Sequence, residues 1–301
     1  MVVQMFNLPY FLWIFLSVGL FFGLYFLLKN RTERTQRIVL FSILVFALLL
    51  HFLKAFIPPY STDPSRLHRD IWFINICGAN IFLFPFLFVI KNETLHDYMF
   101  YIGVFSGFLA TLYPTEALDR DLSEILDITR FYVHHAILWI VPLLMVLLGL
   151  HKLNYRRVIR VGPCLLGLFV FILLNQIIQQ EIGFTPVRGF AGELGNLDVY
   201  DITEIGYKNT SYIWGADADD PIGMIFDIFC PKIFKTIPVG KYKGQRRHWP
   251  FIWLIVPVMV IITPLCFAVS MIFDRKHFVE DMGRVKIYLK ARFELIKSKR
   301  K

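Results

Sequence analysis

The segment FNLPYFLWIFLSVGLFFGLYFLL, residues 6–28, decides the class of fold. A helix needs about 20 apolar residues to cross the hydrocarbon core of a bilayer, and this run is long enough. Lys29, Arg31 and Arg34 follow it at once, and no basic residue precedes it. A cleavable signal peptide would have a basic region before the apolar run. We therefore expect a retained first transmembrane helix whose C-terminal end is cytoplasmic.

The composition of the whole chain agrees with this class. Of the 301 residues, 56% are hydrophobic and 17% are aromatic, with a mean hydropathy of +0.55. A soluble domain of this length cannot bury so much apolar side chain. The formal charge of +9 would raise nucleic acid as the partner of a soluble protein. Here the basic residues lie in short segments between apolar runs, which is typical of membrane orientation, so we expect membrane lipids and no nucleic acid as partners.

The apolar runs predict an all-α, polytopic membrane protein with seven transmembrane helices. The predicted spans are residues 6–28, 37–57, 71–90, 97–113, 131–150, 159–178 and 250–273. We find no internal repeat of the kind that inverted-repeat transporters carry. We expect a multi-pass protein of the cell membrane.

The Lys and Arg residues of the connecting segments orient these spans. With the N-terminus outside, nineteen basic residues fall in inside segments and only four in short outside loops. Such an excess marks the cytoplasmic side. We therefore predict an external N-terminus and a cytoplasmic C-terminus.

Two domains follow from this topology. Residues 1–273 form the transmembrane bundle, with a long external loop at 179–249, and residues 274–301 form a basic, amphipathic cytoplasmic tail along the inner leaflet. Within the loop, residues 221–238 are apolar but short and interrupted by proline. We expect this stretch to cover the mouth of the bundle or to lie in the outer interface.

Polar residues of the predicted spans collect at one depth. By the helix rise, five helices bring them to a layer roughly 5–12 Å below the outer surface. The layer contains His51, Asn75, Cys77, Asn80, Thr111, Tyr113, His134, His135, Asn175 and Gln176. The interiors of the spans carry no Asp or Glu, and Lys54 can extend outward to the interface. Polar groups in a membrane span are candidates for function because they are costly to bury.

This layer has both structural and catalytic interpretations. A lone cysteine is usually a small hydrophobic residue, a histidine near a helix end is often interfacial, and Asn and Gln often bridge helices. Alternatively, Cys77 and a histidine, His134 or His135, form a nucleophile and a base. Asn80 lies one turn from Cys77 on the same helix face and could stabilise an oxyanion. No metal-binding spacing is present, so we expect neither a metal nor another cofactor.

Four short motifs resemble the YwaF-like bacterial integral membrane family. They are FINICGANIFLFP at 73–85, LYPTE at 112–116, RFYVHHAIL at 130–138 and KNTSYIWGAD at 208–217. Eukaryotic relatives of that family are transmembrane acyltransferases that remodel ether phospholipids with a Cys and a His. The spacing of 58 residues from Cys77 to His135 is similar to theirs. The resemblance implies that His135 rather than His134 is the base, and that Asn209 and Tyr212 belong to a motif at the substrate site.

These observations support a membrane-embedded Cys-His acyltransferase or acyl hydrolase that acts on phospholipid acyl chains at the outer leaflet. A phospholipid would be the acyl donor and a lysolipid the acceptor. The catalytic candidates are Cys77 and His135. The substrate-binding or oxyanion candidates are Asn80, Asn75, His51, Asn175, Gln176, Asn209 and Tyr212. The alternative is a non-enzymatic receptor or a small-solute or lipid-binding protein. A carrier or channel would need a polar stripe that continues to the inner face, which this sequence lacks.

Overall fold

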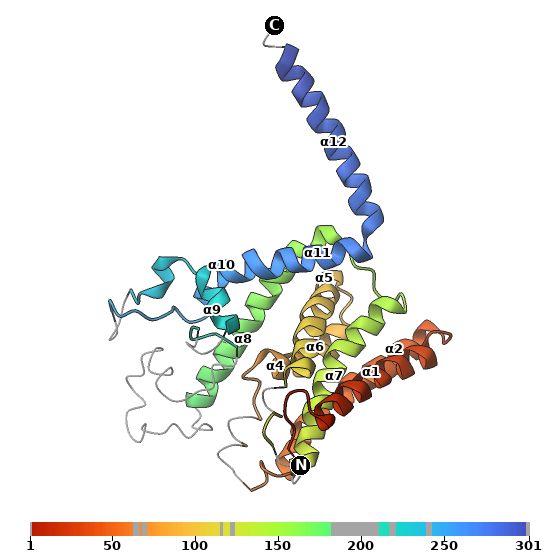
Figure 1. Cartoon of the computed structure of the whole chain (residues 1–301), viewed down its shortest axis with the longest axis vertical. Coiled ribbons are helices and arrows are strands. Elements are labelled where there is room, and N and C mark those ends of the chain that lie inside the picture. The colour runs from red at the N-terminus through yellow and green to blue at the C-terminus, as the bar shows by residue number, and fades with distance from the viewer. Residues whose placement is uncertain are drawn as a thin grey trace.

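The computed structural model describes most of the chain as helices and connecting turns, with no strand among the residues it describes (Figure 1). These are residues 2–62, 67, 71–114, 117–120, 124–181, 211–216, 221–238 and 243–298. The expected all-α class is thus confirmed for the described part of the chain.

Five helical segments of the described chain are long and apolar enough to cross a bilayer. They are α1 (Leu8–Leu28), α2 (Glu33–Leu53) with its extension to Phe56, α7 (Ile125–Leu147), α8 (Val161–Glu181) with the preceding turns from Tyr155, and the run Ile252–Phe273 that contains α10 (Ile255–Pro257) and α11 (Thr263–Phe273). These segments match five of the predicted spans. The total of seven spans and their orientation remain predictions.

The other two predicted spans are shorter or interrupted. In place of 71–90 the structure has α4 (Ile76–Val89), which begins later because Asn75 caps it. In place of 97–113 there is a continuous helical run made of α5 (Glu93–Tyr98), one wide π turn (Met99–Gly103) and α6 (Val104–Leu112). This run starts four residues before the predicted span, and so includes polar residues at its N-terminal end.

The expectation that the interiors of the spans carry no Asp or Glu is wrong for two buried residues. Helix α7 begins at Ile125, six residues before the predicted span, and α5 places Asp97 inside the fourth run. Asp127 and Asp97 are 1% and 0% exposed. Both are paired with arginine, which makes burial of the charge possible. Hydropathy placed Asp97 at the edge of one span and Asp127 outside another, because it scores single residues and not pairs.

Helices α6 and α7 share the most extensive contact among the helix pairs of the described chain, and two glycines permit their close approach. A Cβ built on Gly107 would lie 2.7 Å from the carbonyl oxygen of His135, and one on Gly103 would lie 2.7 Å from that of Leu138. Small residues four apart on one helix face let two membrane helices approach to backbone contact. This contact fixes the part of α7 that carries the histidines.

The long loop returns to the bundle where the structure describes it. The segment 211–216 contacts α8 through a hydrogen bond from Trp214 Nε1 to Gln176 Oε1 (3.0 Å). Helix α9 (Pro221–Ile228) follows, and Phe226 packs against the main hydrophobic core while Ile228 is 75% exposed. One side of this stretch therefore meets the bundle and the other carries exposed apolar side chains. Its place in the outer interface remains a prediction.

The basic tail forms helix α12 (Arg275–Ser298), which extends away from the bundle (Figure 1). Its first turns are tied to the bundle, because Asp281 pairs with Arg156 (2.6 Å) and Phe278 packs edge-on against Tyr155. Farther along, Val285 and Leu289 are exposed. Contact between α12 and the inner leaflet remains a prediction.

Candidate functional site

Cys77 lies in the first turn of α4, at the second helical residue. The Asn75 side chain caps this helix by accepting a hydrogen bond from the Gly78 backbone N–H (2.6 Å). Asn75, a predicted site residue, therefore has a structural role that its position before an apolar run could have indicated. The N–H groups and the dipole of a helix N-terminus favour a negative charge. Cys77 is half-buried in an environment that suits a thiolate or an oxyanion.

Asn80 follows one turn later and is completely buried. Its Oδ1 accepts a hydrogen bond from Tyr98 Oη (2.7 Å), which fixes the orientation of the amide. Its Nδ2 is buried and has no hydrogen-bond partner. A buried amide donor without an acceptor is costly, so it marks a place where a ligand oxygen would be stabilised. The hydroxyl of Tyr98 is a site residue that the sequence analysis missed.

His135 is half-buried on α7. Its Nδ1 lies 2.7 Å from the carbonyl oxygen of Phe131. Because a carbonyl oxygen only accepts, Nδ1 carries the proton, and in the neutral ring Nε2 is then the nitrogen with a lone pair. The Phe131 ring packs against the imidazole with centroids 4.2 Å apart. This contact fixes the orientation of the ring, with Nδ1 toward the backbone of α7.

His134 has a different environment, as its position 100° around the helix predicts. The expected contact with Arg130 is present, with Nη1 3.3 Å from Nδ1. Since arginine only donates, Nδ1 of His134 accepts and Nε2 carries its proton. That Nε2 is buried without a partner, and the ring stacks on His51 with centroids 5.9 Å apart.

His51 is buried and links α2 to the segment that leads into Cys77. Its Nε2 donates to the carbonyl oxygen of Ile71 (2.9 Å), and its ring stacks on Phe73. The structure thus gives His51 a positioning contact beside the site. Lys54, one turn later, is only 3% exposed, so the expectation that it reaches outward to the interface is wrong. Its ammonium lies over the Tyr60 ring at 5.4 Å, a cation–π contact that compensates its burial.

An ion-pair network at the start of α7 was not predicted. Asp127 pairs with Arg130 (2.6 Å) and with Arg120, and Arg130 also donates to Tyr60 Oη (3.3 Å). The residues at 127, 130 and 134 recur at helical spacing, so all three lie on one face of α7. This spacing of polar residues could have predicted from the sequence that the three side chains interact. The network joins the N-terminal part of α7 to the segment that follows α2.

The remaining predicted site residues fall at the end of α8 and in the loop. Asn175 has a buried Nδ2 without a partner, whereas Gln176 accepts the Trp214 hydrogen bond and ties the loop to the bundle. The carbonyl of Tyr212 accepts from Trp253 Nε1 (2.7 Å). Asn209 lies outside the described residues. Of the wider polar layer, Thr111 is buried and bonds back to Gly107, and Tyr113 is 60% exposed.

One cluster in the loop has the donor types of a metal site. Possible ligand atoms of Asp227, Cys230 and His248 lie within 4.8 Å of one another, and such donors suit Zn²⁺. However, Lys235 Nζ is 2.7 Å from Asp227 Oδ2 and already compensates its charge. Burial raises the pKa of Cys230 to about 11, so the thiol is protonated when no metal is bound. Asp227, Lys235 and His248 therefore form a hydrogen-bonded cluster in which the lysine balances the charge of the carboxylate.

The helices and their buried polar groups define an all-helical, multi-pass membrane protein. Comparison with known families identifies it further: the TMEM164 family matches residues 4–196, and the chain belongs to this family. Searches of curated proteins and of solved structures returned no match. The match covers α1 to α8 and includes Cys77 and His135. The resemblance to YwaF-like proteins remains a prediction.

Proposed function

We propose that this protein transfers acyl chains of membrane phospholipids through a thioester on Cys77. The observation that carries the proposal is the first turn of α4. There a half-buried thiol lies at a capped helix N-terminus, and the Asn80 amide one turn away offers a buried donor without an acceptor. Nucleophilic acyl transfer needs both a stabilised thiolate and a donor for the oxyanion. The expected location within the outer leaflet suits an acyl ester of a phospholipid.

In the proposed reaction, His135 Nε2 takes the proton of the Cys77 thiol. The thiolate attacks the ester carbonyl carbon, and Asn80 Nδ2 stabilises the resulting oxyanion. Collapse of this intermediate forms the thioester and releases the lysophospholipid alcohol, which takes the proton from His135. A lysolipid hydroxyl then attacks the thioester, giving its proton to His135, and a new ester and the thiolate result. Water in place of the lysolipid would give a free fatty acid.

The two neighbouring histidines have different hydrogen-bond partners and therefore different tautomers, which supports His135 as the base. Its tautomer leaves Nε2 as a proton acceptor. His134 accepts from Arg130 through Nδ1, so its Nε2 is a donor and would take up a proton only after losing that contact. The proposal therefore places His135 on the reacting side and His134 in the positioning network.

The test uses the full chain reconstituted in nanodiscs that contain a phosphatidylcholine with an alkyne-labelled acyl chain. A lysophospholipid serves as acceptor. We expect a hydroxylamine-sensitive label on Cys77, detected by mass spectrometry of the peptide, and labelled product lipid. Cys77→Ala should abolish both signals. His135→Ala should lower the rate by about 10²–10⁴-fold, the usual contribution of a general base.

Cys164→Ala is the matched control, because Cys164 is also half-buried in an apolar helix but lies on α8. It should keep the wild-type rate, and His134→Ala should cost much less than His135→Ala. A Cys77→Ala variant with wild-type turnover would refute the proposal. Binding of the labelled lipid without a thioester or product would favour the alternative, a non-enzymatic lipid-binding protein or receptor.

A further inference from the structure

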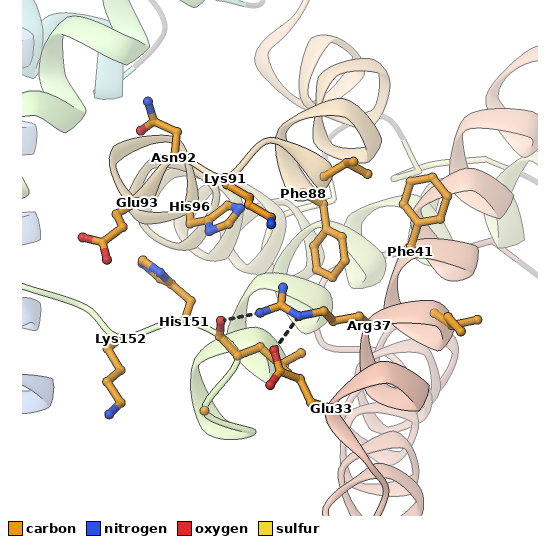
Figure 2. A pocket seen from close by; sticks show the side chains of 14 residues that line it. Glu33, Arg37, Phe41, Phe88, Lys91, Asn92, Glu93, His96, His151 and Lys152 are labelled. Carbon is orange, nitrogen blue, oxygen red and sulfur yellow. Dashed lines mark hydrogen bonds and ion pairs between the residues drawn. The ribbon is translucent and has the colours of Figure 1, made fainter.

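A second polar site lies at the opposite end of the bundle, beside the basic segments that we predict to be cytoplasmic. A cavity of about 920 Å³ opens between the start of α2, the turn between α4 and α5, and the segment that joins α7 to α8. Figure 2 shows the side chains that line it. This volume is within the usual range for sites of small ligands. The cavity shares no residue with the proposed acyl-transfer site.

The positive charge of the cavity is only partly compensated. Arg37 is held by Glu33 (2.8 Å) and by the carbonyl oxygen of Leu150 (3.2 Å), as the dashed lines in Figure 2 show. The other lining carboxylate, Glu93, pairs with an arginine outside the cavity. Lys91 and Lys152 have no ion pair with any residue that the structure describes. Two positive charges therefore remain for a ligand.

His96 adds a buried polar group inside the cavity. It is 9% exposed, lines the cavity, and its Nε2 is buried without a hydrogen-bond partner. The ring packs edge-on against His151, whose own Nε2 bonds to Asp97 (2.7 Å). The Nε2 atom of His151 is thus already paired, whereas that of His96 is not. A buried polar group without a partner indicates a ligand atom that completes it.

One wall of the cavity is apolar and continues onto the lipid-facing surface. Ile38 and Phe41 come from α2, and Phe88 and Val89 come from the end of α4. Val89 is 63% and Ile38 is 55% exposed, and in a bilayer acyl chains would cover these side chains. A ligand that fits must therefore combine an anionic head with an apolar tail.

We propose that this cavity binds the phosphomonoester headgroup of an anionic phospholipid of the phosphatidic acid type, with its acyl chains along the wall of Ile38, Phe41 and Val89. A phosphomonoester carries a charge of about −1.5 to −2 at neutral pH, which matches the two uncompensated lysines. Basic pockets between helices on the cytoplasmic side are suited to such headgroups. This lipid would be bound as a regulator or structural partner, at a distance from the acyl-transfer chemistry.

The experiment measures retained lipid by native mass spectrometry of the purified full chain. The protein is titrated with dioleoyl phosphatidic acid, with dioleoyl phosphatidylcholine, and with water-soluble glycerol 3-phosphate. We expect saturable binding of phosphatidic acid that is at least tenfold tighter than that of phosphatidylcholine. Equal affinity for the two lipids would overturn the proposal. Binding of glycerol 3-phosphate as tight as that of the lipid would also overturn it, since the ligand would then be a free phosphate ester.

The variant Lys91→Ala with Lys152→Ala removes both uncompensated charges. It should weaken binding of phosphatidic acid about thirtyfold, since each basic residue near the surface contributes about 1 kcal/mol. The control variant, Lys29→Ala with Arg31→Ala, removes the same charge from the same end of the bundle but lies outside the cavity. It should bind within about twofold of wild type, and equal losses in the two double variants would overturn the proposal. If the first double variant does not fold, each single lysine variant should weaken binding about fivefold by the same reasoning, and unchanged binding in both would overturn it.

Discussion

The glycine contact between α6 and α7 gives a sharp prediction. In Gly107→Ala, the new Cβ would lie 2.7 Å from the His135 carbonyl oxygen and 2.9 Å from the Trp139 nitrogen. Both are backbone atoms, so no side chain can move to make room. The two helices must separate by roughly 0.5–1 Å, enough to forfeit a quarter to a half of each close contact.

The magnitude follows from two opposing effects. Overpacking of a close contact costs about 1–3 kcal/mol. Replacing glycine by alanine within a helix returns roughly 0.5–1 kcal/mol. We therefore expect Gly107→Ala to be destabilised by about 1–2 kcal/mol. The displaced segment carries His135, so the rate of acyl transfer should also fall.

Gly23→Ala is the matched control, because Gly23 is also a helical glycine but its Cβ would meet nothing within 4 Å. Only the gain in helix propensity should then remain. The assay is the midpoint of thermal denaturation in detergent, followed by size-exclusion chromatography of a fluorescently tagged protein. We expect a midpoint roughly 2–6 °C lower for Gly107→Ala and an unchanged or higher one for Gly23→Ala. A Gly107→Ala protein as stable as the Gly23→Ala protein would refute the packing argument.

Three further predictions concern the described polar contacts. Trp214→Phe keeps an aromatic ring but lacks the indole N–H that bonds to Gln176, so limited proteolysis should cut the long loop faster, and an unchanged cleavage rate would contradict the link. Asp97→Asn should lower stability by about 1–3 kcal/mol, because Arg157 and His151 lose their buried charged partner while Arg157 keeps its ion pair with Glu93; a thermal midpoint equal to wild type would rule this out. For Asp227, burial alone would raise the pKa of the carboxyl, but hydrogen bonds from its lysine and histidine partners outweigh burial and lower it. Its contribution to loop stability should be present above about pH 4 and lost as the pH falls through the lowered folded-state pKa, so tryptophan fluorescence should show an acid transition that Asp227→Asn lacks.

Part of the candidate site could be predicted from the sequence. The helix rise placed His51 and His134 at one depth, and the structure stacks their rings. The position of Asn75 before an apolar run could also have predicted that it caps a helix. What could not be predicted is which polar groups share a hydrogen bond. The pairing of Asn80 with Tyr98 joins α4 to α5, and no local pattern encodes such a contact.

The sequence by itself determined the class of this protein and most of its spanning segments. Hydropathy is a sum over neighbouring residues, and a run such as 6–28 needs no partner to favour the bilayer. Only the tertiary structure decided that Nδ1 of His135 bonds to the Phe131 carbonyl, whereas Nδ1 of His134 is held by Arg130. It also decided that Asp97 could be buried, because His151 and an arginine from a distant segment reach it. The physical reason is that burial of a charge depends on a partner brought close by the fold, whereas partition of an apolar helix depends only on its own residues.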